Sequence, residues 1–245
     1  MKLTAAAQIA PLPVDVIHTA SPQIKDWRFV VSPYGWMPGI SGETGVGDLS
    51  ANVDVTFSDL LSHLKFAAMG SFEASRGAWV GILDDVYASI RIDHTLSRGR
   101  VRPELDLTTK MLITQAFVAF TVKPSPRIDV DLLGGGRLWA VKATLAVSSD
   151  ITHRERNRSP SWADALLGAR LRWRASPKWQ FNLEGDGGAG GSRATGEGIA
   201  TASYDFSKHW GAYAAFRYLY ENREKGDYFF TGHMSGPVIG AAYHW

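Results

Sequence analysis

Hydrophobic and polar positions alternate along most of the chain from residue 26 onward, with the period of two that an extended strand imposes. After Pro177, for example, Trp179, Phe181 and Leu183 share one face. The opposite face is polar and carries Lys178, Gln180, Asn182, Glu184 and Asp186. Segments of this kind recur between turn-forming residues, so the pattern predicts an all-β antiparallel fold of about ten strands, with twelve or eight as alternatives.

The last predicted strand places apolar residues on one face and ends on an aromatic ring. Ile239, Tyr243 and Trp245 lie on this face. A soluble protein seldom exposes such a stripe, whereas the closing strand of an outer-membrane β-barrel turns it toward lipid. We therefore expect a transmembrane up-and-down barrel in which these three residues form a lipid-facing C-terminal signal. A soluble β-sandwich is the alternative, but its outward face should carry the charges.

Turn-forming residues divide the connections into short and long ones. Short turns are expected near Arg76, Ser125, Pro177 and Lys208. Longer loops are expected at 38–64, 93–103, 144–160, 187–196 and 221–232. Barrels of this class place the short turns and both termini on the periplasmic side and the long loops outside. Because the chain then starts and ends on the same side, the number of strands must be even. Within the first long loop, Ser58 is a candidate cap for a short helix that reaches Leu64.

The faces opposite the apolar ones carry charges of both signs, and in a barrel they point into the lumen. The predicted lumen network is Glu73, Asp85, Arg91, Asp131, Arg137, Asp164, Arg170, Arg172, Glu184, Asp186 and Arg217. In the segment 78–92 this assignment turns Val80, Ile82, Val86 and Ile90 toward lipid, and it leaves Asp84 unexplained on the apolar face. A barrel of about ten strands has a narrow interior. We therefore expect the charges to pair across it and to plug it.

Composition narrows the function classes further. No apolar run approaches the roughly 18 residues of a membrane-spanning helix. The absence of cysteine excludes disulfides and thiolate metal sites, and a net charge of +2 gives no reason to expect nucleic acid. Residues 1–25 are interpreted as a degenerate signal or a disordered segment, and 26–245 as the barrel domain. Expected partners are outer-membrane lipid, lipopolysaccharide and the barrel-assembly machinery.

Several short motifs resemble a family of uncharacterised proteobacterial outer-membrane β-barrel proteins, which are small and porin-like. The motifs are Trp162-Ala-Asp164 with Gly168 and Arg170, Gly185-Asp-Gly-Gly188, Phe216-Arg-Tyr-Leu219, Gly236-Pro-Val-Ile-Gly240, Tyr34-Gly-Trp-Met-Pro-Gly39 and the segment Val53–Leu64. The chain departs from the family pattern at Gly190 and Trp245, where the family has phenylalanine. The resemblance covers most of residues 27–245 and implies an outer-membrane barrel, and it carries over no catalytic residue.

Other motifs give weaker signals. The glycine run 185–191 lacks the lysine and helix of a phosphate loop, so close backbone approach is the better interpretation. His94, His153 and His233 lie on predicted outer loops, where an outer-membrane protease or lipid A deacylase would carry its site. Arg154, Arg156 and Arg158 are candidates for contact with lipopolysaccharide phosphates. We predict a non-catalytic structural or surface-interaction barrel without cofactor or metal. A narrow small-solute porin and a loop-borne hydrolase remain as alternatives.

Overall fold

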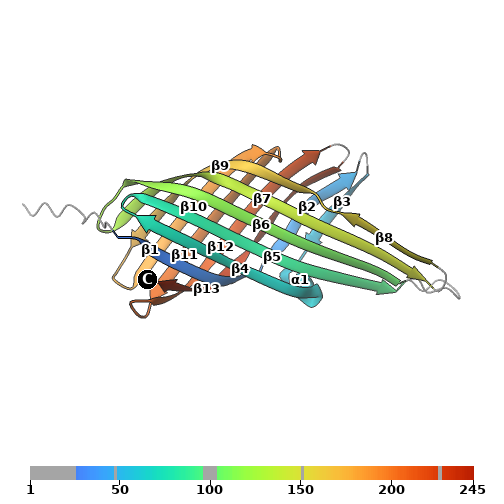
Figure 1. Ribbon diagram of the computed structural model, residues 1–245, viewed down its shortest axis with the longest axis horizontal. Helices are drawn as coiled ribbons and strands as arrows, with labels where there is room; N and C mark the ends of the chain where they lie inside the picture. Colours follow the sequence, from blue (N-terminus) through green and yellow to red (C-terminus); the bar gives the residue numbers. More distant parts are fainter. Residues whose placement is uncertain (1–25, 47–48, 96–103, 150–151, 226–227) are drawn as a thin grey trace, which may run out of the picture.

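The computed structural model describes residues 26–46, 49–95, 104–149, 152–225 and 228–245, and they form one antiparallel sheet with a single short helix (Figure 1). The elements in chain order are β1 (Arg28–Trp36), β2 (Gly39–Val46), β3 (Leu49–Val55), α1 (Phe57–His63), β4 (Leu64–Arg76), β5 (Trp79–Thr95), β6 (Glu104–Lys123), β7 (Ile128–Ser149), β8 (Thr152–Arg158), β9 (Ser161–Arg174), β10 (Trp179–Gly190), β11 (Ala194–Asp205), β12 (Trp210–Lys225) and β13 (Tyr228–His244).

The sheet closes on itself through its first and last strands. β1 pairs with β4 on one side and with β13 on the other, and Val31 lies opposite Tyr243. Between them the strands follow in the order β4, β5, β6, β7, β9, β10, β11, β12 and β13. The fold is therefore a closed antiparallel barrel of ten strands, as the alternation predicts, and three further strands lie outside the ring.

Most of the segments predicted as long loops extend the sheet instead. β2 and β3 form a hairpin that continues the sheet along β13, and β8 pairs with the far half of β7. β5 and β6 pair as far as Thr95 and Glu104, and β12 and β13 as far as Lys225 and Tyr228. These connections are long, as predicted, but they contain strand structure, because turn-type residues such as Gly42 and Gly232 face each other within the ladder, where the backbones approach closely.

Three of the four short turns contain a serine three residues before the first residue of the next strand. The hydroxyl oxygens of Ser125, Ser176 and Ser207 accept backbone N–H bonds from Ile128, Trp179 and Trp210 at 2.8, 3.0 and 2.9 Å. Such bonds satisfy backbone donors where the ladder ends. The fourth short turn, between β4 and β5, uses Gly77 with φ +60°, which a residue with a Cβ rarely adopts. Both ends of the ring lie at this short-turn side (Figure 1).

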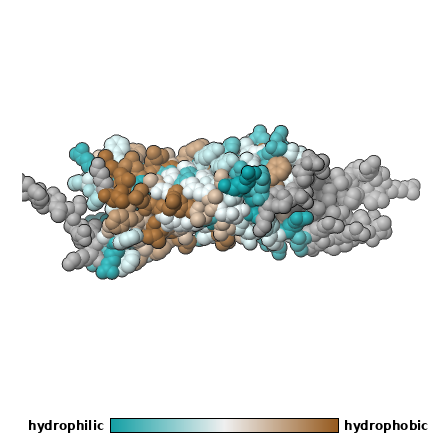
Figure 2. All heavy atoms as spheres, turned by 90° about the horizontal axis from the view of Figure 1, so that it is seen from above, coloured by the Kyte–Doolittle hydropathy of each residue, from teal (hydrophilic) through white to brown (hydrophobic). Residues whose placement is uncertain are grey.

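The outer surface of the barrel carries a belt of exposed apolar side chains above the short turns. Figure 2 shows this belt on one face as a brown zone. Large apolar residues on it are 37–76% exposed, and examples are Trp79, Leu132, Leu167, Leu183 and Phe216. Aromatic pairs such as Trp79 with Phe120, at a ring-centroid distance of 4.9 Å, lie near the short turns. An apolar band with aromatic girdles is the lipid-facing surface of a transmembrane β-barrel.

The interior is packed and is partly apolar. One buried cluster includes Trp36, Val86, Ile113 and Trp139, and a second includes Val80, Phe117, Ala119, Leu133 and Leu166. The prediction that Val80, Ile82, Val86 and Ile90 face lipid was therefore wrong. On β5 both faces are apolar, since Trp79 and Leu83 are exposed on the other side. Hydrophobicity alone cannot decide which face of such a strand is the inner one.

The helix α1 follows β3 and leads into β4. Its N-cap is Thr56 and not Ser58, because the Thr56 hydroxyl accepts a bond from the Asp59 backbone N–H and the Asp59 carboxylate accepts one from the Thr56 backbone. Among the described residues, no helix is long and apolar enough to cross a bilayer.

Candidate functional site

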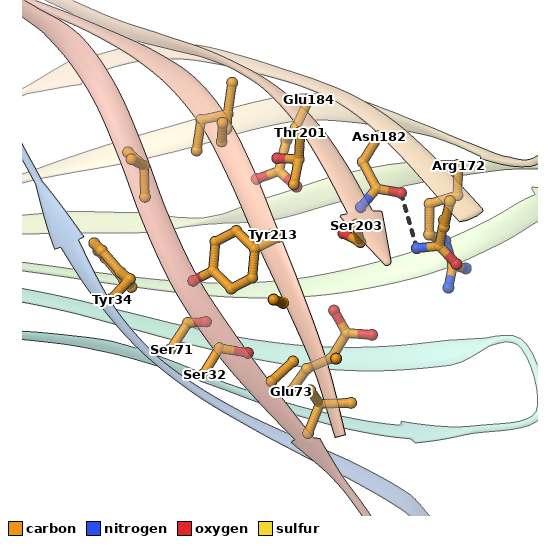
Figure 3. A pocket seen from close by; sticks show the side chains of 18 of the residues that line it. Ser32, Tyr34, Ser71, Glu73, Arg172, Asn182, Glu184, Thr201, Ser203 and Tyr213 are labelled. Carbon is orange, nitrogen blue, oxygen red and sulfur yellow. Dashed lines mark hydrogen bonds between the residues drawn. The ribbon is translucent and has the colours of Figure 1, made fainter. Parts of the chain in front are cut away.

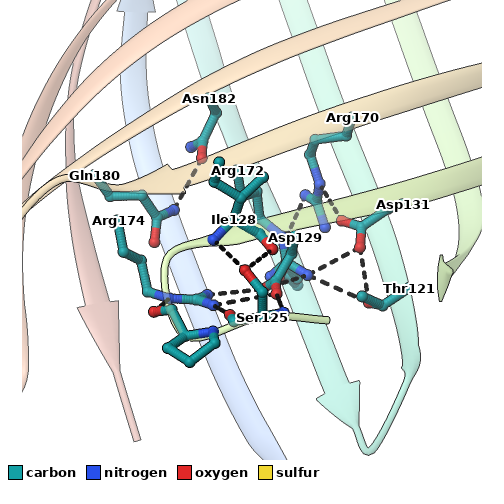
Figure 4. Close-up of polar contacts among 12 residues, drawn as sticks. Thr121, Ser125, Ile128, Asp129, Asp131, Arg170, Arg172, Arg174, Gln180 and Asn182 are labelled. Carbon is teal, nitrogen blue, oxygen red and sulfur yellow. Dashed lines mark hydrogen bonds and ion pairs between the residues drawn. The ribbon is translucent and has the colours of Figure 1, made fainter. Parts of the chain in front are cut away.

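Charged side chains occupy the lumen of the barrel in successive layers, and the first layer lies at the short turns. At the β6–β7 turn, Arg174 donates to Asp129 at 2.6 Å and to the carbonyl oxygen of Ser125 (Figure 4). The Asp129 carboxylate also accepts the Ser125 backbone N–H at 3.2 Å. This fork joins the start of β7 to the end of β9 and closes the turn.

Asp131 is the centre of the next layer and is fully buried. Its carboxylate accepts bonds from the Thr121 hydroxyl at 2.7 Å, from Arg170 Nε at 2.9 Å and from Arg172 at 3.0 Å (Figure 4). Arg170 also reaches across the lumen from β9 to Glu73 on β4, at 2.8 Å. Two arginines on one buried carboxylate give full compensation for its charge, which an isolated buried carboxylate would lack.

The middle layer is built around Arg137, whose side chain is fully buried. Arg137 donates to Gln115 at 2.8 Å, to the Thr195 hydroxyl at 2.7 Å and to Asp186 at 3.0 Å. The Gln115 amide in turn donates to Glu197 on β11 at 3.1 Å. These contacts connect β6 and β7 to β10 and β11 through the interior.

Arg217 on β12 spans the lumen in the opposite direction. It lies 2.8 Å from Glu197, 3.0 Å from Asp84 on β5 and 3.0 Å from the hydroxyl of Tyr34 on β1. The Tyr34 hydroxyl donates to Asp84 at 2.7 Å. The guanidinium also lies 4.8 Å from the ring centre of Trp36, a cation–π contact. One arginine thus joins three sectors of the wall.

Above this layer the polar contacts lie on β9, β11 and β12. Trp162 donates from its indole to Glu221 at 2.8 Å, and Arg223 lies 4.1 Å from the Trp162 ring centre. The Asp164 carboxylate accepts both the backbone N–H and the hydroxyl of Ser192 at 2.8 Å. These contacts hold the β10–β11 connection against the wall.

Nine of the predicted network residues point into the lumen and two do not. The inward residues are Glu73, Asp131, Arg137, Asp164, Arg170, Arg172, Glu184, Asp186 and Arg217. Asp85 and Arg91 lie on the outward face of β5, and the Asp85 carboxylate accepts a bond from the Thr114 hydroxyl at 2.6 Å. The assignment of these two was wrong because Asp84 and Asp85 are consecutive and occupy opposite faces.

Other lumen residues were missed by the sequence analysis. The alternation alone does not place Asp84, which pairs with Arg217, or mark out Gln115, Glu197 and Glu221, which are buried. Gln115 interrupts an apolar run, which is the signal of a polar group facing inward. Glu197 lies two positions from Thr195 on the face that continues to Ile199 and Thr201, so extending the alternation of β11 backward would have placed it.

A vestibule of about 270 Å³ lies in the lumen, and its lining runs from Arg217 to His244 near the short turns. Figure 3 shows part of this lining, including Ser32, Thr201 and Tyr213. Hydroxyl groups of Ser32, Ser71, Thr201, Ser203 and Tyr213 line it together with charged residues that include Arg170, Arg172 and Arg217. Within the part of the chain that the structure describes, no three His, Asp or Glu side chains gather as a metal site. The vestibule can hold water and small polar solutes.

The glycine run 185–191 forms strand and not a phosphate loop. β10 includes its residues up to Gly190 and pairs with β9 and β11 on its two sides. A Cβ added at Gly188 would overlap the Ala165 carbonyl oxygen. Close backbone approach is therefore the reason for glycine here.

The remaining predicted sites lie at the ends of the barrel. Arg158, in β8, is exposed, whereas the side chains of Arg154, Arg156, His94 and His153 lie outside the described residues. Ile239 is 61% and Trp245 51% exposed on the outer face, and the Trp245 ring lies 5.5 Å from that of Phe29. Paired backbone bonds of 3.1 Å between Phe29 and Trp245 close the ring at its edge.

No family model matches the chain, and no curated protein matches it. The translocator domain of the autotransporter NalP from Neisseria meningitidis has 14% identity, a TM-score of 0.47 and coverage of 89% of this chain and 88% of that one. Ail of Yersinia pestis, in complex with the heparin analogue sucrose octasulfate, has 13% identity, a TM-score of 0.39 and coverage of 89% and 98%. The toluene transporter TbuX of Ralstonia pickettii has 10% identity, a TM-score of 0.37 and coverage of 90% and 89%.

These structures are outer-membrane β-barrels with varied roles. At such distances they add no site residue, ligand or activity to this chain. The assignment as a transmembrane barrel rests on its own closed sheet and apolar belt.

Proposed function

We propose that this protein is a non-catalytic barrel of the Gram-negative outer membrane whose lumen is closed to ions, and that it has a structural or surface-interaction role. The observation that carries the proposal is the Arg217 side chain, which reaches from β12 to Asp84 on β5 at 3.0 Å and to Glu197 on β11 at 2.8 Å. Any ion crossing the barrel would have to separate these pairs.

The energetics support a closed lumen. Arg137, Asp131 and Arg217 are each at most 2% exposed. Removing one partner of such a buried pair leaves an uncompensated charge, which destabilises the folded protein by about 3–5 kcal/mol. The packed apolar cluster around Val86, Ile113 and Trp139 fills the space beside the charges. Wide aqueous channels belong to barrels of roughly 16 to 18 strands.

The parts beyond the apolar belt are suited to surface interaction. We place the short turns in the periplasm, so that the β2–β3 hairpin and the β7–β8 extension project outside the cell. Arg158 is exposed on this extension, which supports its contact with lipopolysaccharide phosphates. Arg154 and Arg156 remain candidates for the same contact from the sequence alone. The C-terminal face with Ile239, Tyr243 and Trp245 would be read by the assembly machinery.

Fractionation and planar-bilayer recording test this proposal. The protein, expressed with a competent signal sequence in a Gram-negative host, should appear in the outer membrane and should show a heat-sensitive gel shift. The purified barrel should give no steady conductance. Recovery as a soluble monomer without detergent would contradict the location, and large stable channel events would contradict the closed lumen.

The vestibule favours one second candidate, a narrow small-solute porin. Its space of about 270 Å³ is lined by hydroxyl groups and by Arg217, so a small polar solute could enter it as far as the Arg217 layer. The porin would replace the closed barrel if the wild-type protein forms channels and if Arg170→Ala or Asp186→Ala changes their ion selectivity without changing the stability of the barrel.

A further inference from the structure

The barrel wall is interrupted between β1 and β4. Their pairing runs only from Arg28 opposite Ser75 to Pro33 opposite Gly70. Beyond Pro33, which has no N–H to donate, β1 pairs with β13 alone, and the 64–69 half of β4 pairs with β5 alone. The Trp36 backbone N–H donates to the sulfur of Met69 at 3.2 Å, where a closed ladder would supply a carbonyl oxygen. The two strands therefore diverge.

An apolar cavity of about 280 Å³ fills the region where the strands diverge. No charged side chain lines it, and its one phenol, Tyr34, is already bonded to Asp84. The chain contains five methionines, and all of them except Met1 line this cavity. They are Met37, Met69, Met111 and Met234. Methionine side chains are flexible and polarizable, so they adapt to apolar ligands of different shape.

The helix α1 covers this cavity without filling it. Phe57, Leu60, Leu61 and Leu64 lie at helical spacing and line the cavity, whereas Ser58, Asp59 and Ser62 carry the polar face. An apolar helix face normally supplies most of the stability of a short helix by being buried. No residue of α1 is buried, and Leu61 is 54% exposed. The helix therefore has apolar surface available for a further partner.

We propose that this cavity binds an uncharged apolar small molecule of about the size of a one- or two-ring hydrocarbon, with access beneath α1 where β1 and β4 diverge. An enclosed apolar cavity of about 150 Å³ takes up benzene or xenon, and the present cavity is larger, apolar and partly open. The absence of lining charges excludes a ligand with a buried carboxylate or ammonium, which would lack a partner. The site lies beside the charge network and does not depend on whether the lumen conducts.

Methionine-methyl NMR tests the site directly. The barrel is labelled with 13C-methyl methionine, reconstituted in lipid nanodiscs and titrated with naphthalene. The methyl signals of Met37, Met69, Met111 and Met234 should shift together and saturate. Equal, non-saturating drift of every signal would mean partition into the bilayer and would overturn the proposal.

Two neighbouring alanines provide a matched pair of variants. Ala67 lines the cavity, whereas Ala68, exposed on the adjacent position of β4, lies on the outer face. Ala67→Phe should weaken naphthalene binding by about tenfold or more because the ring occupies the ligand volume. Ala68→Phe should leave it unchanged. A heat-sensitive gel shift checks that each variant is folded, and Met37→Leu provides a second, volume-conserving comparison.

The source of the apolar group is decided by competition. Saturating decanoate should not displace naphthalene, because the cavity offers no cation for its carboxylate. Displacement by decanoate, or methionine shifts that follow the acyl-chain length of the nanodisc lipid and not the added naphthalene, would assign the cavity to a lipid chain and overturn the proposed ligand class.

Discussion

The two sides of the lumen are packed by different physical rules. On the β9–β12 side, long charged residues such as Arg170 and Arg217 hold specific partners across the barrel at 2.8–3.0 Å. On the side where β1 diverges from β4, Trp36, Met69 and Val86 surround an apolar cavity of about 280 Å³. Charged groups require partners at fixed positions, whereas apolar contacts are non-directional. The first side should resist change, and the second should adapt to a ligand.

Trp36 belongs to both sides. Its ring lies 4.8 Å from the Arg217 guanidinium, and it also lines the cavity. A ligand in the cavity would therefore contact a residue that packs directly on the network. The contrast between the sides can be tested by substitutions that affect only one of them.

The largest expected effect is on the charged side. Arg170→Ala removes the arginine from Asp131, which is fully buried, and from Glu73. The free energy of unfolding, measured in urea with the barrel in lipid vesicles, should fall by about 3–5 kcal/mol. Arg193→Ala is the control: it also removes an arginine–glutamate pair, but both side chains are at least half exposed, so about 1 kcal/mol or less should be lost. Equal losses of unfolding free energy in the two variants would contradict the conclusion that the buried ion pairs stabilise the barrel more than exposed ones.

Replacing each of two consecutive aspartates should separate the inner from the outer face of β5. Asp84→Asn weakens the contacts with Arg217 and Tyr34, and should lower the unfolding free energy by about 1.5–3 kcal/mol, the range for a bond to a charged group. Asp85→Asn affects the outward bond from Thr114, and it should change the unfolding free energy by about 1 kcal/mol or less. A larger effect of Asp85→Asn than of Asp84→Asn would mean that Asp85, and not Asp84, faces the lumen.

These two residues also show how far sequence reasoning reaches. Period-two alternation was enough to place Glu184 and Asp186 in the lumen, because Trp179, Phe181 and Leu183 on the opposite face leave no doubt about which side meets lipid. On β5 both faces are apolar, so the same argument chose the wrong one. A residue that breaks the pattern, as Asp84 does, deserves more weight on such a strand than the hydrophobic count.

The apolar cavity could not be predicted from the alternation. Met37, Met69, Met111 and Met234 are far apart in the sequence, and only the closure of β1 on β13 and the divergence from β4 bring them together. The cross-lumen partners of Arg217 are likewise set by the shear of the barrel, which strand patterns do not encode. Local turn chemistry was easier: three of the four short turns begin with a serine, which the sequence displays.

The smallest expected effect concerns the cap of α1, on the adaptable side. Thr56→Ala removes the hydroxyl that accepts the Asp59 N–H, so hydrogen exchange of the α1 amides should accelerate by about fivefold, the typical consequence of losing an N-cap. Exchange in β9 and β10 should not change. Ser58→Ala is the control, because its hydroxyl contacts only that of Thr56, at 2.8 Å.

The same cap should depend on pH in one direction. Hydrogen bonds from the Thr56 side chain and backbone lower the pKa of Asp59 below its ordinary value of 3.8. A carboxylate with a lowered pKa stabilises the folded form above the unfolded pKa and loses this contribution as the pH falls through the folded one. After correction for intrinsic exchange rates, protection of α1 should therefore be constant at neutral pH and decline below about pH 4 in the wild-type protein. In Asp59→Asn this decline should be absent. If it persists in that variant, the Asp59 carboxylate is not the group that causes it.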